Sequence, residues 1–197
     1  MTTQADDPLL AAALLHHRQP HRAYHDARHV LELLELARTH APDLTASERL
    51  AILFHDAVYV PGAPKGENEA LSALLMRATL FALEGAGVLT MPAATVIDDA
   101  DTIIRATTHA EPPPLLAARM CDLDLWRLAA PWSDFVRHGE DIRHEFRYLH
   151  TSDEAFWTAR RAFYRSMLEK PAIFATSYFR DRFEAQARDN LRRAIDM

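Results

Sequence analysis

Cysteine and long apolar runs are scarce in this 197-residue chain, and each scarcity excludes a class of protein. The only cysteine is Cys121, which rules out a disulfide framework and any metal site built from several cysteines of one chain. No apolar run reaches membrane-spanning length, and Asp6 and Asp7 stand where a signal peptide needs basic residues. We therefore expect a cytoplasmic protein that is neither exported nor inserted in a membrane.

An excess of positive charge is also missing. The chain has 22 Lys and Arg against 28 Asp and Glu, a net charge of −6, and no block of basic residues stands out. A nucleic-acid duplex or an anionic membrane surface is therefore not an expected partner. What the chain does have is 11 histidines, the side chain that titrates near neutral pH and is the commonest metal ligand.

Glycine is scarce too, with only 5 residues, and apolar residues recur at spacings of three and four. Since no run of alternating β-branched residues indicates a strand, we predict an all-α, single-domain helical bundle over residues 1–197. An exposed loop is expected over 61–66. Helices are expected over 8–18, 29–39, 45–54, 67–84, 93–109, 115–128, 133–149, 152–168 and 178–195.

The dipeptide His55-Asp56 at the end of the third helix is the strongest single signal for chemistry. Two consecutive side chains about 100° apart on a helix can hold one ion from the same turn. The alternative is a histidine that caps helix carbonyls beside an exposed aspartate.

Other parts of the sequence contain residues that could bind the same ion as His55 and Asp56. His29 begins a helix upstream, and Asp122-Leu123-Asp124 lies in a helix downstream. This order of His, His-Asp and Asp on three helices resembles the HD superfamily of metal-dependent phosphohydrolases. The chain is most similar to a bacterial branch, the predicted metal-dependent HD phosphohydrolases, in segments spread over most of its length: 22–25 with His29, 54–59, 68–73, 104–109, 122–125, 142–146 and 183–191.

The resemblance implies an all-helical bundle that holds a divalent ion. The ligands it implies are His29, His55, Asp56 and Asp122. Asp124 competes with Asp122, but residues two apart on a helix point to nearly opposite faces, so only one should reach the ion, and Asp122 is the choice. Imidazole and carboxylate ligands do not distinguish among Mn, Mg, Co, Ni, Zn and Fe.

The activity implied is hydrolysis of a phosphate ester, with a nucleotide or another small phosphorylated metabolite as the substrate. Asp56 would orient the attacking water and Glu69 would transfer a proton. The alternative for Glu69 is structural, with Asn68 as the helix N-cap and Glu69 favouring the helix dipole.

The residues expected to contact the substrate lie beside the motif segments: Arg22 as first choice, His25, Lys65, His109 and Arg143. His25 shares a face with His29 if the helix begins early, and is otherwise a solvated loop histidine. His109 is alternatively a ligand of a second ion or a helix cap. Glu145 could orient an arginine or a ligand histidine, but a solvated salt bridge is the more economical interpretation.

Two rival functions stay open. The domain could bind a nucleotide or metal without turnover and regulate another process. It could instead hold two iron ions and use oxygen, for which His109 would supply an additional ligand. The sequence also leaves a homo-oligomer open.

Overall fold

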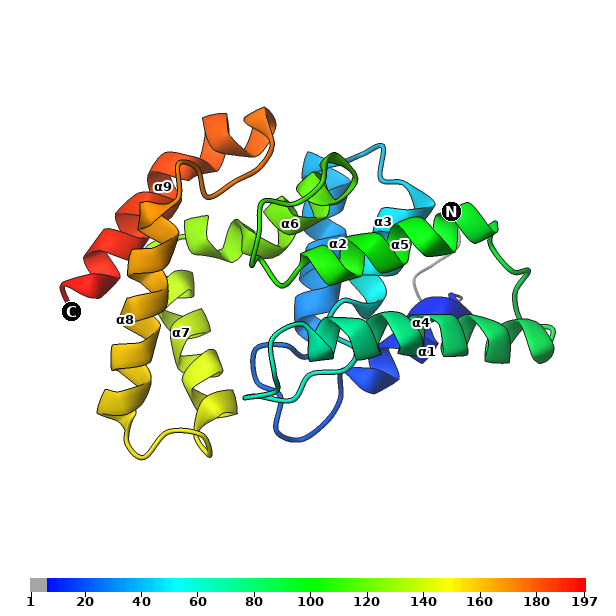
Figure 1. Cartoon of the computed structure of the whole chain (residues 1–197), viewed down its shortest axis with the longest axis horizontal. Coiled ribbons are helices and arrows are strands. Elements are labelled where there is room, and N and C mark those ends of the chain that lie inside the picture. Colours follow the sequence, from blue (N-terminus) through cyan, green and yellow to red (C-terminus); the bar gives the residue numbers. More distant parts are fainter. Residues whose placement is uncertain (1–6) are drawn as a thin grey trace.

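The chain is all-helical in a computed structural model that describes residues 7–197. Figure 1 shows α1–α5 on one side of the molecule, α7–α9 on the other, and α6 between them. The helices are α1 Pro8–His16, α2 Ala27–His40, α3 Ala46–Phe54, α4 Glu67–Gly85, α5 Ala94–Ala106, η2 Leu115–Ala117, α6 Ala118–Leu125, η3 Trp126–Ala129, α7 Trp132–Phe146, α8 Asp153–Glu169 and α9 Ser177–Ile195. Since no strand occurs in the described residues, the predicted all-α class is confirmed. None of these helices is both long enough and apolar enough to cross a membrane.

Polar side chains fix where several helices begin. Asp7 and Ser152 accept hydrogen bonds from backbone N–H groups in the first turns of α1 and α8. At the start of α3, the Thr45 side chain accepts from the Glu48 N–H at 3.1 Å, and the Glu48 carboxylate accepts from the Thr45 N–H at 2.9 Å. This predicted capping box satisfies two N–H groups that would otherwise lack partners, and so fixes the start of α3.

The structure differs from the expected boundaries at several places. α1 ends at His16 and not at 18, α2 begins at Ala27 and not at 29, and α7 ends at Phe146 and not at 149. α5 ends at Ala106 and not at 109, because the chain turns at Thr107 and the His109 backbone has a φ of 51°. The helix expected over 115–128 is divided into η2, α6 and η3. α4 follows Gly66, and the Asn68 side chain does not cap it but bonds to the backbone N–H and C=O of Val60.

The helix α3 lies at the centre of the first side. It packs against α1, α2, α4, α5 and α6, and Ile52, Leu53 and Phe54 are completely buried. His55 and Asp56 follow its last turn, where His55 is buried and Asp56 is half-buried.

The second side of the molecule is joined to the first through η3 and α9. α8 packs against α7 and α9, and α9 packs against η3. The Asn190 amide on α9 donates to the carbonyls of Leu128 and Ala130, at 2.9 and 2.8 Å. One cluster of buried apolar side chains extends from Leu10 to Leu191, which is compatible with the expected single domain.

Candidate metal centre

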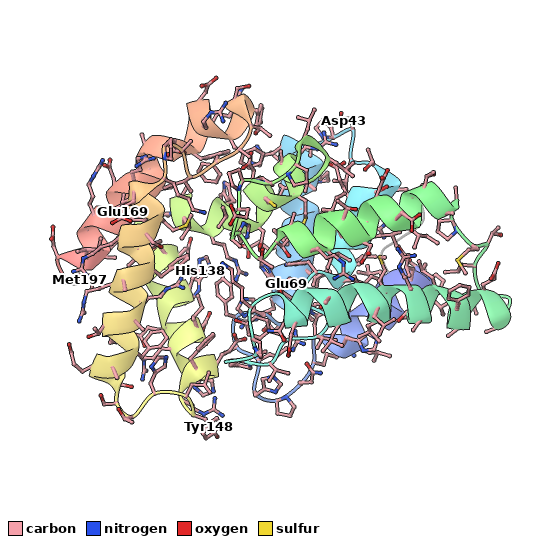
Figure 2. The ribbon with its side chains drawn as sticks, viewed as in Figure 1. Asp43, Glu69, His138, Tyr148, Glu169 and Met197 are labelled. Carbon is pink, nitrogen blue, oxygen red and sulfur yellow. The ribbon has the colours of Figure 1, made fainter. Side chains whose placement is uncertain are left out.

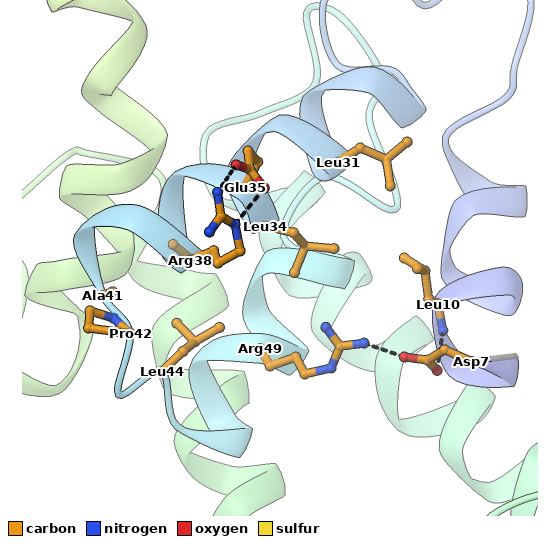
Figure 3. Close-up of a pocket in the computed structure, with 11 residues that line it drawn as sticks. Asp7, Leu10, Leu31, Leu34, Glu35, Arg38, Ala41, Pro42, Leu44 and Arg49 are labelled. Carbon is orange, nitrogen blue, oxygen red and sulfur yellow. Dashed lines mark hydrogen bonds and ion pairs between the residues drawn. The ribbon is translucent and has the colours of Figure 1, made fainter. Parts of the chain in front are cut away.

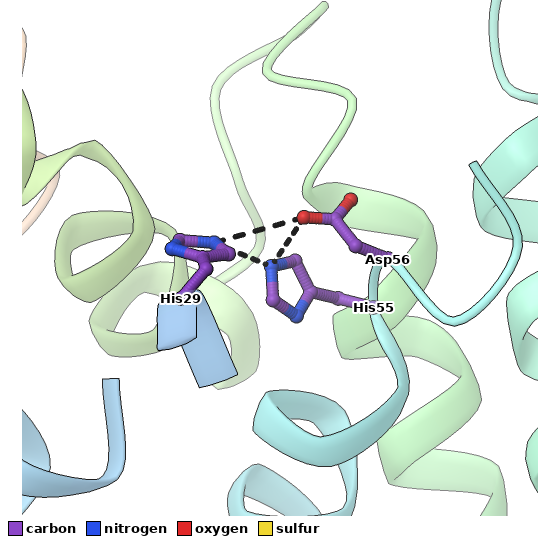
Figure 4. A group of neighbouring side chains, drawn as sticks. All are labelled: His29, His55 and Asp56. Atoms are coloured by element: carbon purple, nitrogen blue, oxygen red, sulfur yellow. Dashed lines mark hydrogen bonds and ion pairs between the residues drawn. The ribbon is translucent and has the colours of Figure 1, made fainter. Parts of the chain in front are cut away.

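Two helices bring three side chains to one point. His29 lies in the first turn of α2, which Asp26 caps, and His55-Asp56 follows α3. The two imidazole Nε2 atoms are 3.2 Å apart, and Asp56 Oδ2 lies 3.0 Å from His55 Nε2 and 3.6 Å from His29 Nε2 (Figure 4). These three residues form a group that could hold a metal ion.

A third helix, α6, adds Asp124. Its Oδ1 lies 3.2 Å from His29 Nε2 and 3.5 Å from His55 Nε2. Its other oxygen lies 2.9 Å from Nε2 of His109. We call His29, His55, Asp56 and Asp124 the His/Asp cluster.

The choice of Asp122 over Asp124 is wrong. The Asp122 carboxylate accepts hydrogen bonds from the backbone N–H groups of Ala175 (2.6 Å) and Thr176 (2.8 Å) and from the Thr176 hydroxyl (2.6 Å). The two aspartates do point to different faces of α6, as expected, but the face toward α2 and α3 carries Asp124. Asp122 instead fixes the loop before α9.

Three residues of the His/Asp cluster, His29, His55 and Asp56, form a group that fits a divalent ion. Asp124 contacts both imidazoles but lies outside this group of three. An ion about 2.1 Å from each ligand holds neighbouring ligand atoms roughly 3.0 to 3.4 Å apart in octahedral or tetrahedral geometry. The contacts given above are 3.0–3.6 Å. His29 and His55 are 0 % and 1 % exposed, whereas the Asp56 and Asp124 side chains are 15 % and 18 % exposed, so solvent reaches the carboxylate side.

The Nδ1 atoms of His29 and His55, which point away from the cluster, differ in their hydrogen bonds. His55 Nδ1 lies 3.2 Å from the carbonyl of Ile52. Because a carbonyl only accepts, this nitrogen carries the proton, and Nε2 faces the cluster. His29 Nδ1 is buried without a hydrogen-bond partner in the described part of the chain, and the His29 ring stacks on Tyr24 with 5.6 Å between centroids.

The cluster concentrates negative charge beside the two imidazoles. Burial lowers the pKa of His29, whereas for His55 the effect of burial is outweighed by Asp56 and Asp124, which raise its pKa well above the ordinary value. Burial alone would raise the pKa of both carboxyl groups, but His55 acts on Asp56, and hydrogen bonds from His109, His29 and His55 act on Asp124, so both pKa values are lowered. Both carboxylates are therefore ionised and suited to a cation.

His25, expected to contact substrate, is a fixed side chain and not a solvated one. Its Nδ1 lies 2.7 Å from Glu145 Oε2, and its ring stacks on Tyr59 with 3.8 Å between centroids. Glu145 is 2 % exposed, and its Oε1 accepts the N–H groups of Ala23, Tyr24 and His25, each at 2.8 Å. Although burial opposes ionisation, the bonds from His25 and this backbone lower the pKa of Glu145 to about 2. The expected solvated salt bridge for Glu145 is therefore wrong.

Arg22, the first choice for holding phosphate, has a structural role instead. It is only 7 % exposed, and its guanidinium donates to the carbonyls of His25 (2.8 Å), Asp56 (2.6 Å) and Ala57 (3.0 Å), as well as to the Gln19 side chain. These bonds leave little of the guanidinium for a ligand. Arg22 holds the backbone after His55-Asp56 against the segment before α2.

The remaining predicted contacts lie outside the cluster. Arg143 pairs at the surface with Glu140 (2.7 Å) and Asp153 (2.9 Å), so it does not reach the site. Lys65 is exposed in the 61–66 loop. Glu69 is half-buried at the start of α4 (Figure 2) and has no hydrogen bond or ion pair to the described residues, so its proton-transfer role stays a prediction.

Sequence reasoning missed Lys170. This residue follows α8, and its ammonium donates to the carbonyl of His109 at 3.2 Å. The contact joins residues 61 positions apart, which no local motif reveals. For Asp124, by contrast, a signal existed: its alternation with Asp122 on one helix.

Comparison with known proteins identifies no relative: no family model matches the chain, and no curated protein or solved structure matches it significantly.

Proposed function

We propose that this chain is a divalent-metal-dependent phosphohydrolase of the HD type that acts on a small phosphorylated substrate such as a nucleotide. The observation that carries the proposal is the His/Asp cluster, in which two buried imidazoles lie 3.2 Å apart and each lies 3.0–3.6 Å from an oxygen of both ionised carboxylates. Its four side chains come from the His, His-Asp and Asp segments that carry the HD resemblance, with Asp124 in place of Asp122.

The four cluster residues would hold the ion and leave one side open. A bound divalent ion supplies positive charge for phosphate oxygens and lowers the pKa of a coordinated water. The partly exposed carboxylates of Asp56 and Asp124 mark the side from which substrate would approach. Asp56 would orient this water.

His25 is the residue best placed to accept a proton. The ionised Glu145 carboxylate can only accept, so it keeps the hydrogen on His25 Nδ1 and leaves the Nε2 lone pair available. The His25 ring lies 6.1 Å from the His29 ring, centroid to centroid. A carboxylate that orients a histidine in this way is the usual arrangement for a general base.

The test is metal analysis combined with turnover. Protein purified without chelator or affinity tag is analysed for metal, then stripped and reloaded with Mn, Mg, Co, Ni, Zn or Fe. Each form is assayed for phosphate release from nucleotides, other monoesters and diesters. We expect near-stoichiometric metal and hydrolysis of one phosphate class, both lost in His55→Ala.

The matched control is His144→Ala, since His144 is exposed on α7. This variant should keep both metal and activity. Metal retained in full by His55→Ala would overturn the site assignment. Stoichiometric metal and nucleotide binding without any product would overturn hydrolysis and leave a regulatory binding module.

One observation favours a second candidate. The two oxygens of Asp124 face different histidines, Oδ1 toward His29 and His55 and Oδ2 toward His109. A carboxylate placed in this way could bridge two ions, as an oxygen-dependent di-iron protein requires. Two irons per chain, with activity lost under anaerobic conditions, would favour oxidation over hydrolysis.

A further inference from the structure

Two cavities of small-molecule size differ in their relation to the His/Asp cluster. A cavity of about 810 Å³ between α1, α2 and α3 is lined by apolar side chains and by the Glu35–Arg38 and Asp7–Arg49 ion pairs (Figure 3). It shares no residue with the cluster. A second cavity, of about 540 Å³, has His109 in its wall, and we call it the His109 cavity.

The His109 cavity lies between the 109–113 loop, α6 and the 170–175 loop, with Arg180 of α9 at its edge. Leu125, Ile173 and Phe174 give it apolar walls, and its volume is in the range of sites that enclose a small organic molecule. Apolar walls of this kind favour a flat hydrocarbon or aromatic body over a hydrated sugar.

The charges around the His109 cavity favour an anion. Lys170 and Arg180 both line it. The Lys170 ammonium has three N–H donors and gives one to the His109 carbonyl, and Arg180 donates through one nitrogen to the carbonyls of Phe174 and Ala175. Both cations therefore keep donors for a ligand.

Two carboxylates, Glu111 and Asp122, also line the cavity, but neither occupies the free donors of Lys170 and Arg180. Both Asp122 oxygens are already bonded to the 175–176 backbone and hydroxyl, and they face that loop. Glu111 also lines the cavity but is exposed to solvent, which screens its charge.

His109 connects this cavity to the cluster. Its carbonyl accepts from Lys170 at the cavity wall, while its Nε2 lies 2.9 Å from Asp124 Oδ2. None of the four cluster residues lines the cavity, so a molecule in the cavity would contact His109, which in turn contacts the cluster.

We propose that the His109 cavity binds the organic part of the substrate, an aromatic or similarly flat apolar body that carries an anionic group in addition to the phosphate at the cluster. This inference rests on the proposed function. Lys170 and Arg180 would recognise the second anion, and the apolar walls would recognise the ring.

The test uses three phosphonates that cannot be hydrolysed as esters: methylphosphonate, phenylphosphonate and 4-carboxyphenylphosphonate. Their affinities for the metal-loaded full chain are measured by calorimetry. We expect phenylphosphonate to bind about tenfold more tightly than methylphosphonate, and the carboxylated probe several-fold more tightly again.

Two variants test separately how the cavity recognises the phenyl ring and the carboxylate of the probes. Ala172→Trp fills the cavity wall and should remove the preference for phenyl over methyl, and Lys170→Met should remove the preference for the carboxylate. Their matched controls are Ala82→Trp on the exposed side of α4 and Arg165→Met on the exposed side of α8, which should bind like the wild type. Circular dichroism checks that every variant is folded.

The outcomes separate the inference from the proposed function. Equal affinity for all three probes, or preferences unchanged in Ala172→Trp and Lys170→Met, would overturn the cavity assignment even if phosphate esters are hydrolysed. The expected preferences, with no ester hydrolysed under any metal, would support the cavity as a binding site and overturn the phosphohydrolase.

Discussion

Asp122 and Asp124 lie two residues apart on α6, yet their carboxylates have different kinds of partner. Asp122 bonds to two backbone N–H groups and a hydroxyl of the loop before α9. Asp124 faces three imidazoles, those of His29, His55 and His109. The first set of partners is fixed by the fold, whereas the second could be shared with an added cation.

Other buried charged or polar residues also fall into these two groups, those bonded to the backbone and those that face one another. Arg22 and Glu145 bond mainly to the backbone, so their hydrogen bonds are satisfied without a ligand. His29, His55 and Asp56 face one another. A buried charge bonded to the backbone stabilises the fold, and a buried group of charges facing one another indicates a site.

The largest expected effect is that of Asp124→Asn, which tests whether the charges that face one another bind metal and the backbone-bonded charges do not. Loss of one ionised ligand should lower metal affinity at least about 100-fold and abolish turnover. Asp122→Asn, a change of the same kind two residues away, should bind metal as the wild type does. Calorimetric titration with the best metal gives both affinities, and the division fails if Asp122→Asn loses metal while Asp124→Asn keeps it.

Glu145→Gln tests whether a buried charge bonded to the backbone stabilises the fold, because its contribution to stability should depend on pH. The pKa of Glu145 is lowered from 4.5 to about 2 in the folded protein, so its ionisation stabilises the fold above pH 4.5 and this contribution disappears as the pH falls toward 2. The shift corresponds to about 3 kcal/mol. Glu145→Gln should therefore be less stable than wild type by about this amount at pH 7, with the difference shrinking below pH 4.5.

Urea unfolding from pH 7 to pH 3 measures this difference. His17 and His138 also have pKa values lowered by burial, to about 4 and about 3, but wild type and variant share them. A stability difference that does not change with pH would show that the Glu145 charge is not the stabilising feature.

Asp122→Asn should have a smaller effect on stability than Glu145→Gln. The amide presents an NH₂ group to one of the N–H donors of Ala175 or Thr176, and a buried donor without an acceptor costs about 1–3 kcal/mol. Urea unfolding at pH 7 measures this cost. The control is Asp98→Asn, since the Asp98 side chain is 68 % exposed in its pair with Arg77 and should change stability by less than about 1 kcal/mol.

The sequence predicted the fold well because local signals define most helices. The N-caps Asp7 and Ser152 and the Thr45–Glu48 box are where the pattern places them. The breaks in the 115–128 segment were not predicted, because no Gly or Pro lies between these residues to mark an interruption.

Some residues of the candidate site were predicted from the sequence and others were not. The sequence identified His29, His55 and Asp56 as neighbours, and the structure brings them together. The choice of Asp122 over Asp124 was wrong, because which of the two faces the histidines depends on how α6 is rotated against α2 and α3. Sequence reasoning assigned Arg22 to phosphate because a basic residue near a motif does not reveal whether carbonyls already occupy it.

Arg143→Gln should have the smallest effect. Arg143 belongs to neither kind of buried charge, since its partners Glu140 and Asp153 lie at the surface, where ion pairs contribute less than about 1 kcal/mol. Stability, metal affinity and turnover should all stay close to wild type. Arg22→Gln, by contrast, removes bonds to three buried carbonyls and should unfold at clearly lower urea concentration. If Arg143→Gln instead raised KM for a phosphorylated substrate with unchanged stability, Arg143 would contact substrate, and an exposed ion pair would have to be counted as part of the site.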